Sequence, residues 1–130
     1  MKDQLISKRT ALLAKEVGFS VKTDDWFIKS EDVARDGLFL CELSEKYIVR
    51  QPTQTLLTRW LRKKYGIDAY CDPILVGKKL RWVASIRRLD RLRNDNCHVF
   101  IDNGSRAGYE AALEIALYHA IKEMLYFNNQ

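Results

Sequence analysis

The sequence predicts an α+β fold in which a helix, a three-stranded antiparallel meander and a long C-terminal helix follow one another between residues 52 and 130. Two stretches, 54–65 and 108–126, carry apolar residues at helical spacing, and the stretch between them alternates apolar and polar residues with a period of two. The connections between the expected strands are short, which favours antiparallel neighbours. A chain of 130 residues is long enough for one domain with its own core, so we expect residues 1–51 to form an extension of that domain.

Both helices expected before the sheet have recognisable ends. In the first, over residues 7–17, Ser7 is a suitable N-terminal cap and Gly18 suits the left-handed conformation that follows a last turn. In the second, Thr53 and Gly66 take the same two roles. The apolar arc of the second helix consists of Leu56, Leu57, Trp60, Leu61 and Tyr65.

Residues 20–50 fit two interpretations. Residues 20–30 are typical of a strand, and Asp36-Gly37 then indicates a hairpin turn into a returning strand over 38–43. The alternative is a helix over 31–47, in which Gly37 would cost about 1 kcal/mol relative to alanine. We expect the hairpin.

The three strands of the meander are expected over residues 67–73, 80–88 and 97–102. One face of each is apolar, and a slip of one residue would turn that face outward, so the pattern predicts the register. The inward residues are Ile67, Ala69, Cys71, Leu80, Trp82, Ala84, Ile86, Cys97, Val99 and Ile101. The C-terminal helix is expected to cover them with Tyr109, Leu113, Ala116, Leu117, Ala120, Ile121 and Met124.

Positive charge is concentrated in the middle of the chain. Residues 46–93 contain 13 lysines and arginines and three acidic residues, a net charge of +10, and the rest of the chain has 9 basic and 14 acidic residues. Such a surface favours an anionic partner. With ring side chains at Tyr70, Trp82 and Phe100, it indicates a small non-enzymatic accessory protein that contacts nucleic acid. The candidate contact residues are Arg59, Arg62, Lys63, Lys78, Lys79, Arg81, Arg87 and Arg88.

A protein-interaction module without a nucleic-acid role is the alternative function. On the C-terminal helix, Ile115 and Tyr118 point away from the face that is expected to cover the sheet. Such residues mark a homodimer or partner interface, or they are covered by residues 20–50 lying over the sheet.

The sequence contains no motif that indicates catalysis or a cofactor. Walker loops, nucleophile elbows and paired metal-binding histidines are absent. Cys71, Cys97 and His98 are one ligand short of a usual structural zinc site, so we expect no metal and reduced, buried thiols. The least favoured alternative is a metal-dependent nuclease with acidic residues drawn from Asp24, Asp25, Glu31, Asp32 and Asp72.

The first 19 residues, MKDQLISKRTALLAKEVGF, are interrupted by charged side chains and contain no long apolar run. They match neither a signal peptide nor a membrane span. We therefore expect a cytoplasmic protein without a membrane partner.

Two stretches resemble a group of small uncharacterised bacterial proteins associated with phage and mobile elements. The first, PTQTLLTRWLRKKYGI, begins at Pro52 and contains the Trp60-Leu61-Arg62 triplet. The second, GYEAALEIALYHAIKEML, begins at Gly108. The resemblance covers roughly the last 80 residues and implies no particular activity.

The order helix, three strands, helix is also similar to that of the double-stranded RNA-binding domain. That likeness concerns the fold alone, since one fold hosts many functions. Those domains place basic residues at the start of the last helix, across the phosphates. Here one arginine, Arg106, is followed by Glu110 and Glu114, which argues against the same mode of binding.

Overall fold

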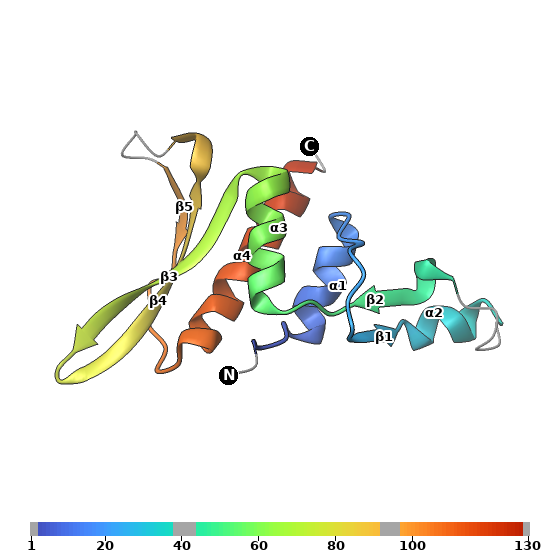
Figure 1. Cartoon of the computed structure of the whole chain (residues 1–130), viewed down its shortest axis with the longest axis horizontal. Helices are drawn as coiled ribbons and strands as arrows, with labels where there is room; N and C mark the ends of the chain where they lie inside the picture. The colour runs from blue at the N-terminus through green and yellow to red at the C-terminus, as the bar shows by residue number, and fades with distance from the viewer. Residues whose placement is uncertain (1–2, 38–43, 92–96, 129–130) are drawn as a thin grey trace.

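The computed structural model describes residues 3–37, 44–91 and 97–128 and confirms the α+β class. The helices are α1 (Lys8–Glu16), α2 (Ser30–Arg35), α3 (Gln54–Tyr65) and α4 (Tyr109–Asn128), with short 3₁₀ helices η2 (Glu45–Tyr47) and η3 (Leu89–Arg91). The strands are β1 (Trp26–Ile28), β2 (Ile48–Arg50), β3 (Ile67–Val76), β4 (Lys79–Arg88) and β5 (His98–Ile101). The molecule is elongated: the hairpin of β3 and β4 lies at one end, α1, α3 and α4 lie in the middle, and β1, β2 and α2 lie at the other end (Figure 1).

The predicted caps of α1 and α3 are confirmed. The backbone N–H of Thr10 donates to Ser7 Oγ at 3.1 Å, and that of Leu56 donates to Thr53 Oγ1 at 3.2 Å. Gly66 ends α3 with a φ of +66°, which a residue with a Cβ rarely adopts. These local signals fix where α3 stops and therefore where β3 starts.

The hairpin of β3 and β4 is longer than the sequence indicated. Its turn is formed by Gly77 and Lys78, with Gly77 at a φ of +63°, as expected for a two-residue type II′ turn. Strand β3 continues through Pro73, which pairs with Trp82, instead of ending there. Proline is tolerated because β3 is an edge strand in the order β3-β4-β5, so its missing N–H faces away from the ladder.

Helix α4 is the centre of the core. It packs on β3 and β4 and also contacts α1 and α3. The predicted face is buried except for Met124, which is partly buried, and Tyr109, which is 42% exposed although its ring meets Trp82 edge-on at 5.1 Å between centroids. The fully buried side chains of α4 are Ala112, Ala116, Leu117, Ala120 and Ile121.

The predicted register of β5 is wrong by one residue at its C-terminal end. Phe100, expected to point outward, pairs with Ile86 on the helix side and stacks on His119 of α4 at 4.4 Å between ring centroids. Ile101, expected to point inward, is 58% exposed. The cause is a β-bulge: Arg87 pairs with His98 and Ile86 with Phe100, so an extra residue on β5 reverses the alternation.

Residues 20–50 form a strand pair, but not around the expected turn. The partner of β1 is β2, and the expected returning strand, 38–43, lies outside the described residues. Gly37 ends the short helix α2 with a φ of +68°. Of the alternative helix over 31–47, the described residues that are α-helical belong to α2, and residues 45–47 form the separate 3₁₀ helix η2.

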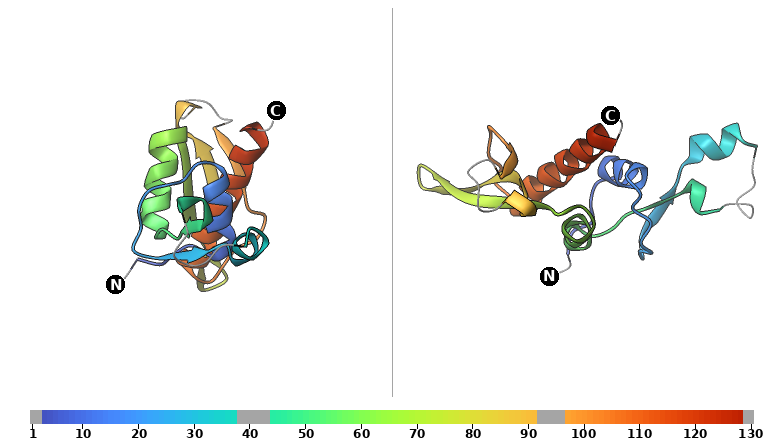
Figure 2. Two further views of the ribbon diagram at one scale, coloured as in Figure 1. Left: turned by 90° about the vertical axis from the view of Figure 1, so that its right-hand side faces the viewer. Right: turned by 90° about the horizontal axis from the view of Figure 1, so that it is seen from above.

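The expectation that residues 20–50 could lie over the sheet is not met. The views of Figures 1 and 2 both place β1, α2 and β2 at the end of the molecule opposite the β3–β4 hairpin. They contact the rest of the molecule through β2, which packs on α1, and through Phe27 of β1, which packs against the core. The outer face of the sheet is therefore not covered by this segment.

The β5 register can be tested by comparing two neighbouring substitutions. We expect Phe100→Ala to lower the free energy of unfolding by about 2–3 kcal/mol, because it removes a ring packed between β4 and α4. Ile101→Ala is the matched control and should cost less than about 1 kcal/mol, since its side chain is largely in water. Urea denaturation followed by circular dichroism measures both, and a larger loss for Ile101→Ala would contradict the bulge.

Candidate nucleic-acid interface

Three of the eight candidate cations lie on the solvent side of α3. Arg59, Arg62 and Lys63 are exposed, because the opposite side of the helix is packed against the core through Leu57 and Leu61. Within the described part of the chain, none of the three cationic groups has an ion pair or a hydrogen bond to another side chain. Their charges are thus available to a ligand.

Two more candidate cations lie at the tip of the β3–β4 hairpin. Lys78 occupies the turn and Lys79 is the first residue of β4. Both are exposed, and neither has an acidic partner among the residues that the structure describes. The tip therefore carries two uncompensated positive charges.

The remaining three candidates are engaged within the chain. Arg81 donates from Nε to Ser105 Oγ and from Nη2 to the Ser105 carbonyl oxygen, both at 2.8 Å. Arg87 Nε donates to Asp68 Oδ2 at 3.0 Å, and Arg88 Nε lies 3.3 Å from Asp90 Oδ1. These arginines connect the sheet to its loops, so their guanidinium groups are only partly available to a ligand.

The eight cations do not converge on one spot. The register pairs Ile67 with Arg88 at the α3 end of the hairpin and Val76 with Lys79 at its tip. Ten residues of antiparallel strand span about 33 Å, so the two ends of the series are far apart. The candidate residues follow the length of the hairpin from α3 to the turn, which is the shape of a track and not of a compact patch.

The three rings that the sequence grouped together are separated by the sheet. Trp82 and Phe100 face α4, where they contact Tyr109 and His119. Tyr70 lies on the outer face, but the Arg87 guanidinium covers its ring at 4.6 Å from the centroid. Because no group of open rings remains among them, base stacking is not supported by this geometry.

Sequence reasoning missed a small polar cluster around Tyr70. The Tyr70 hydroxyl lies 2.7 Å from His98 Nε2, and beneath it Ser85 and Asp68 are almost completely buried. Burial is the main cause that raises the pKa of the Tyr70 hydroxyl, followed by the charge of Asp72. The alternation of apolar and polar residues predicts that Asp68, Tyr70 and Ser85 point outward. It contains no signal that Asp68 and Ser85 would be buried on that outer face.

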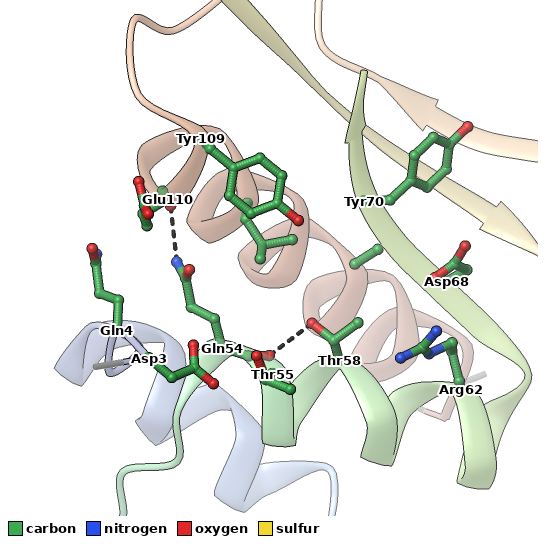
Figure 3. A pocket seen from close by; sticks show the side chains of 12 residues that line it. Asp3, Gln4, Gln54, Thr55, Thr58, Arg62, Asp68, Tyr70, Tyr109 and Glu110 are labelled. Carbon is green, nitrogen blue, oxygen red and sulfur yellow. Dashed lines mark hydrogen bonds between the residues drawn. The ribbon is translucent and has the colours of Figure 1, made fainter. Parts of the chain in front are cut away.

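A pocket of about 570 Å³ lies between α3, the open edge of β3 and α4 (Figure 3). The Gln54 side chain, only 2% exposed, donates from Nε2 to the Glu110 carbonyl oxygen at 2.8 Å and closes one end. Arg62 lines the pocket beside Asp68, whose Oδ2 is already bound by Arg87. The pocket lies between α3 and the sheet, and Arg62 is the cation that it presents to a ligand.

The two candidate interface residues, Ile115 and Tyr118, are half-buried. Ile115 packs against the core, and the Arg9 guanidinium of α1 lies 3.8 Å from the centroid of the Tyr118 ring. Helix α1 therefore covers part of the surface on which a homodimer was predicted to form. The interface itself stays a prediction.

The described residues contain no group of three or more histidine, cysteine or acidic side chains placed to hold a metal ion. His98 faces Tyr70, whereas Cys71 Sγ lies 3.8 Å from the Tyr109 carbonyl oxygen on the helix side, so these two proposed ligands lie on opposite faces. Of the acids considered for a nuclease, Asp32 is paired with Lys29 and Arg35.

Among the helices of the described residues, none combines the length and the apolar character that a membrane span requires.

The Cys71 thiol gives a direct chemical test of the packing between β3 and α4. Burial, and to a lesser degree the charge of Asp72, raises the pKa of this thiol to about 12. Since only the thiolate reacts, we expect iodoacetamide at pH 8 to modify Cys71 at least about a hundredfold more slowly in the folded chain than in urea. Peptide mass spectrometry separates Cys71 from Cys41 and Cys97, and equal rates in both states would contradict the burial.

Comparisons with protein-family models, with curated protein sequences and with solved structures found no match to this chain. The resemblances to phage-associated proteins and to double-stranded RNA-binding domains thus stay predictions. The assignment of function depends on the chain's own geometry.

Proposed function

We propose that this protein is a small non-enzymatic accessory protein that binds nucleic acid through the phosphate backbone. The ligand follows the track of cations from α3 along the β3–β4 hairpin. Contact is mainly electrostatic, because the available cations are exposed and the rings of the sheet are turned inward or covered.

The observation that carries the proposal is the state of the eight candidate cations. Arg81, Arg87 and Arg88 are bound within the chain. The other five have no ion pair or side-chain hydrogen bond among the described residues, and they lie on α3 and at the hairpin tip. Unpaired cations at both ends of the hairpin side can each meet a phosphate of the same extended polyanion, whose charges repeat along its length.

The geometry of α4 favours a mode of binding different from that of double-stranded RNA-binding domains. Glu114 Oε1 accepts hydrogen bonds from the Ser7 backbone N–H at 2.9 Å and from Thr10 Oγ1 at 2.7 Å. This carboxylate ties α4 to α1 near the start of the helix, where those domains present cations. The proposed surface is therefore the α3 and hairpin side of the molecule.

The test is the salt dependence of binding. We expect the full chain to bind nucleic acid at about 50 mM salt and to lose affinity steeply by about 200 mM, because counterions are released on contact. Replacing one phosphate-contacting cation, as in Lys63→Gln, should reduce the slope of log affinity against log salt by about 1, and adding Arg59→Gln should reduce it by about 1 more. Fluorescence anisotropy with a labelled oligonucleotide measures these slopes.

Lys46→Gln is the matched control. Lys46 is also an exposed lysine, but it belongs to η2 at the end of the molecule opposite the hairpin (Figure 1). Its replacement lowers the net charge by the same amount and should leave the slope unchanged. No binding at low salt, or equal effects of Lys46→Gln and Lys63→Gln, would rule out the proposed track.

A further inference from the structure

The outer half of the β3–β4 hairpin extends beyond the rest of the sheet. Strand β5 pairs with β4 over Ser85–Arg87, and nearer the tip the described residues on that side add the backbone bridge between Trp82 and Arg106 and the hydrogen bonds from the Arg81 side chain to Ser105. From the Pro73–Trp82 pair to the turn, no third strand is present among the described residues. We call residues 73–82 the ribbon arm; Figure 1 and Figure 2 show it projecting away from the helices.

The ribbon arm exposes apolar side chains that a solitary molecule has no reason to expose. Leu75 is 74% exposed, and Leu80, which is opposite it in the register, is 54% exposed. Ile74 and Val76 on the other face are also exposed. A group of this kind on a projecting element indicates a surface that is covered when a partner binds.

The charge of the ribbon arm selects the kind of partner. Residues 73–89 include no aspartate or glutamate, while Lys78 and Lys79 occupy the tip. An apolar wedge with two lysines at its tip and no acid is complementary to an anionic partner that also offers apolar contacts. Base edges, and the methyl group of thymine in particular, offer such contacts between two rows of phosphates.

We propose that the ribbon arm enters the major groove of a B-form DNA duplex, an inference that rests on the proposed nucleic-acid binding. That groove is about 12 Å wide and admits a two-stranded ribbon. The Leu75–Leu80 pair then contacts base edges, and Lys78 and Lys79 reach the phosphates beside the groove. The major groove of A-form RNA is too deep and narrow for the same docking, so DNA is preferred to double-stranded RNA.

Two other occupants fit the ribbon arm less well. Inserting the tip into a bilayer would bury the ammonium group of Lys78 first, because this residue forms the turn ahead of the leucines. Pairing the β3 edge with a second copy is hindered by Pro73, which has no N–H to donate to a neighbouring strand. The experiment below includes a result that would identify each of these two occupants.

The experiment compares the full chain with two double variants. Leu75→Ser/Leu80→Ser removes the apolar pair of the ribbon arm, and Leu12→Ser/Val21→Ser removes two exposed apolar side chains elsewhere. Each is titrated by anisotropy into a DNA duplex, the same DNA as a single strand, and an RNA duplex of the same sequence. Thermal melting confirms that each variant is folded, and Lys78→Glu probes the same tip independently.

We expect the wild type to prefer the DNA duplex, and Leu75→Ser/Leu80→Ser to weaken duplex binding about tenfold by leaving both leucines out of the interface. Lys78→Glu should weaken binding of both duplex and single strand, because a phosphate contact is lost in each. The single-strand affinity of Leu75→Ser/Leu80→Ser should change by less than about twofold, and the control variant should match the wild type. Duplex affinity unchanged in Leu75→Ser/Leu80→Ser would overturn this inference while leaving the proposed function standing. No binding of any nucleic acid at low salt would overturn both.

Two further results would reassign the ribbon arm. Binding of the wild type to vesicles of anionic lipid, lost in Leu75→Ser/Leu80→Ser, would identify a membrane as the occupant and overturn the DNA assignment. A wild-type dimer in light scattering that becomes a monomer in the same variant would identify a second copy of the chain and overturn it equally.

Discussion

Close packing of helix α4 on its neighbouring helices and strands is the constraint on which the rest of the molecule depends. Along α4, Ala112, Ala116 and Ala120 are completely buried and occur every fourth residue, so their small side chains let neighbouring elements approach closely. The same helix contacts β3, β4, α1 and α3. Because Glu114 also anchors the start of α1, the position of α4 determines where both the cations of α3 and the plane of the sheet lie.

The parts of the fold that the sequence predicted correctly are those encoded by local signals. The ends of α1 and α3 were predicted from Ser7, Thr53 and Gly66, each of which acts on its own helix within one turn. The buried face of α4 was predicted because a period of 3.6 residues is repeated over five turns. Such signals need no knowledge of the partner element.

The parts that could not be predicted depend on distant contacts. The β-bulge opposite Ile86 turns Phe100 inward, and no residue type in β5 predicts a bulge at that position. The pairing of β1 with β2 spans 20 or more residues of chain, so a nearby turn signal at Gly37 was misleading. In the candidate interface, the sequence predicted which residues are cationic, but not which arginines are bound within the chain. Arg87 meets Asp68, and Arg81 meets Ser105, only because the folded chain brings these distant residues side by side.

The separation of the ribbon arm from the core has a consequence for how this protein can change over evolutionary time. Side chains at the tip contribute almost nothing to the buried core, whereas a change at Ala116 or Leu117 must be accommodated by several elements at once. Substitutions at the tip can therefore accumulate without loss of folding, provided that Gly77 keeps the turn. The molecule combines a closely packed scaffold with a segment in which new binding preferences can arise at little cost to stability.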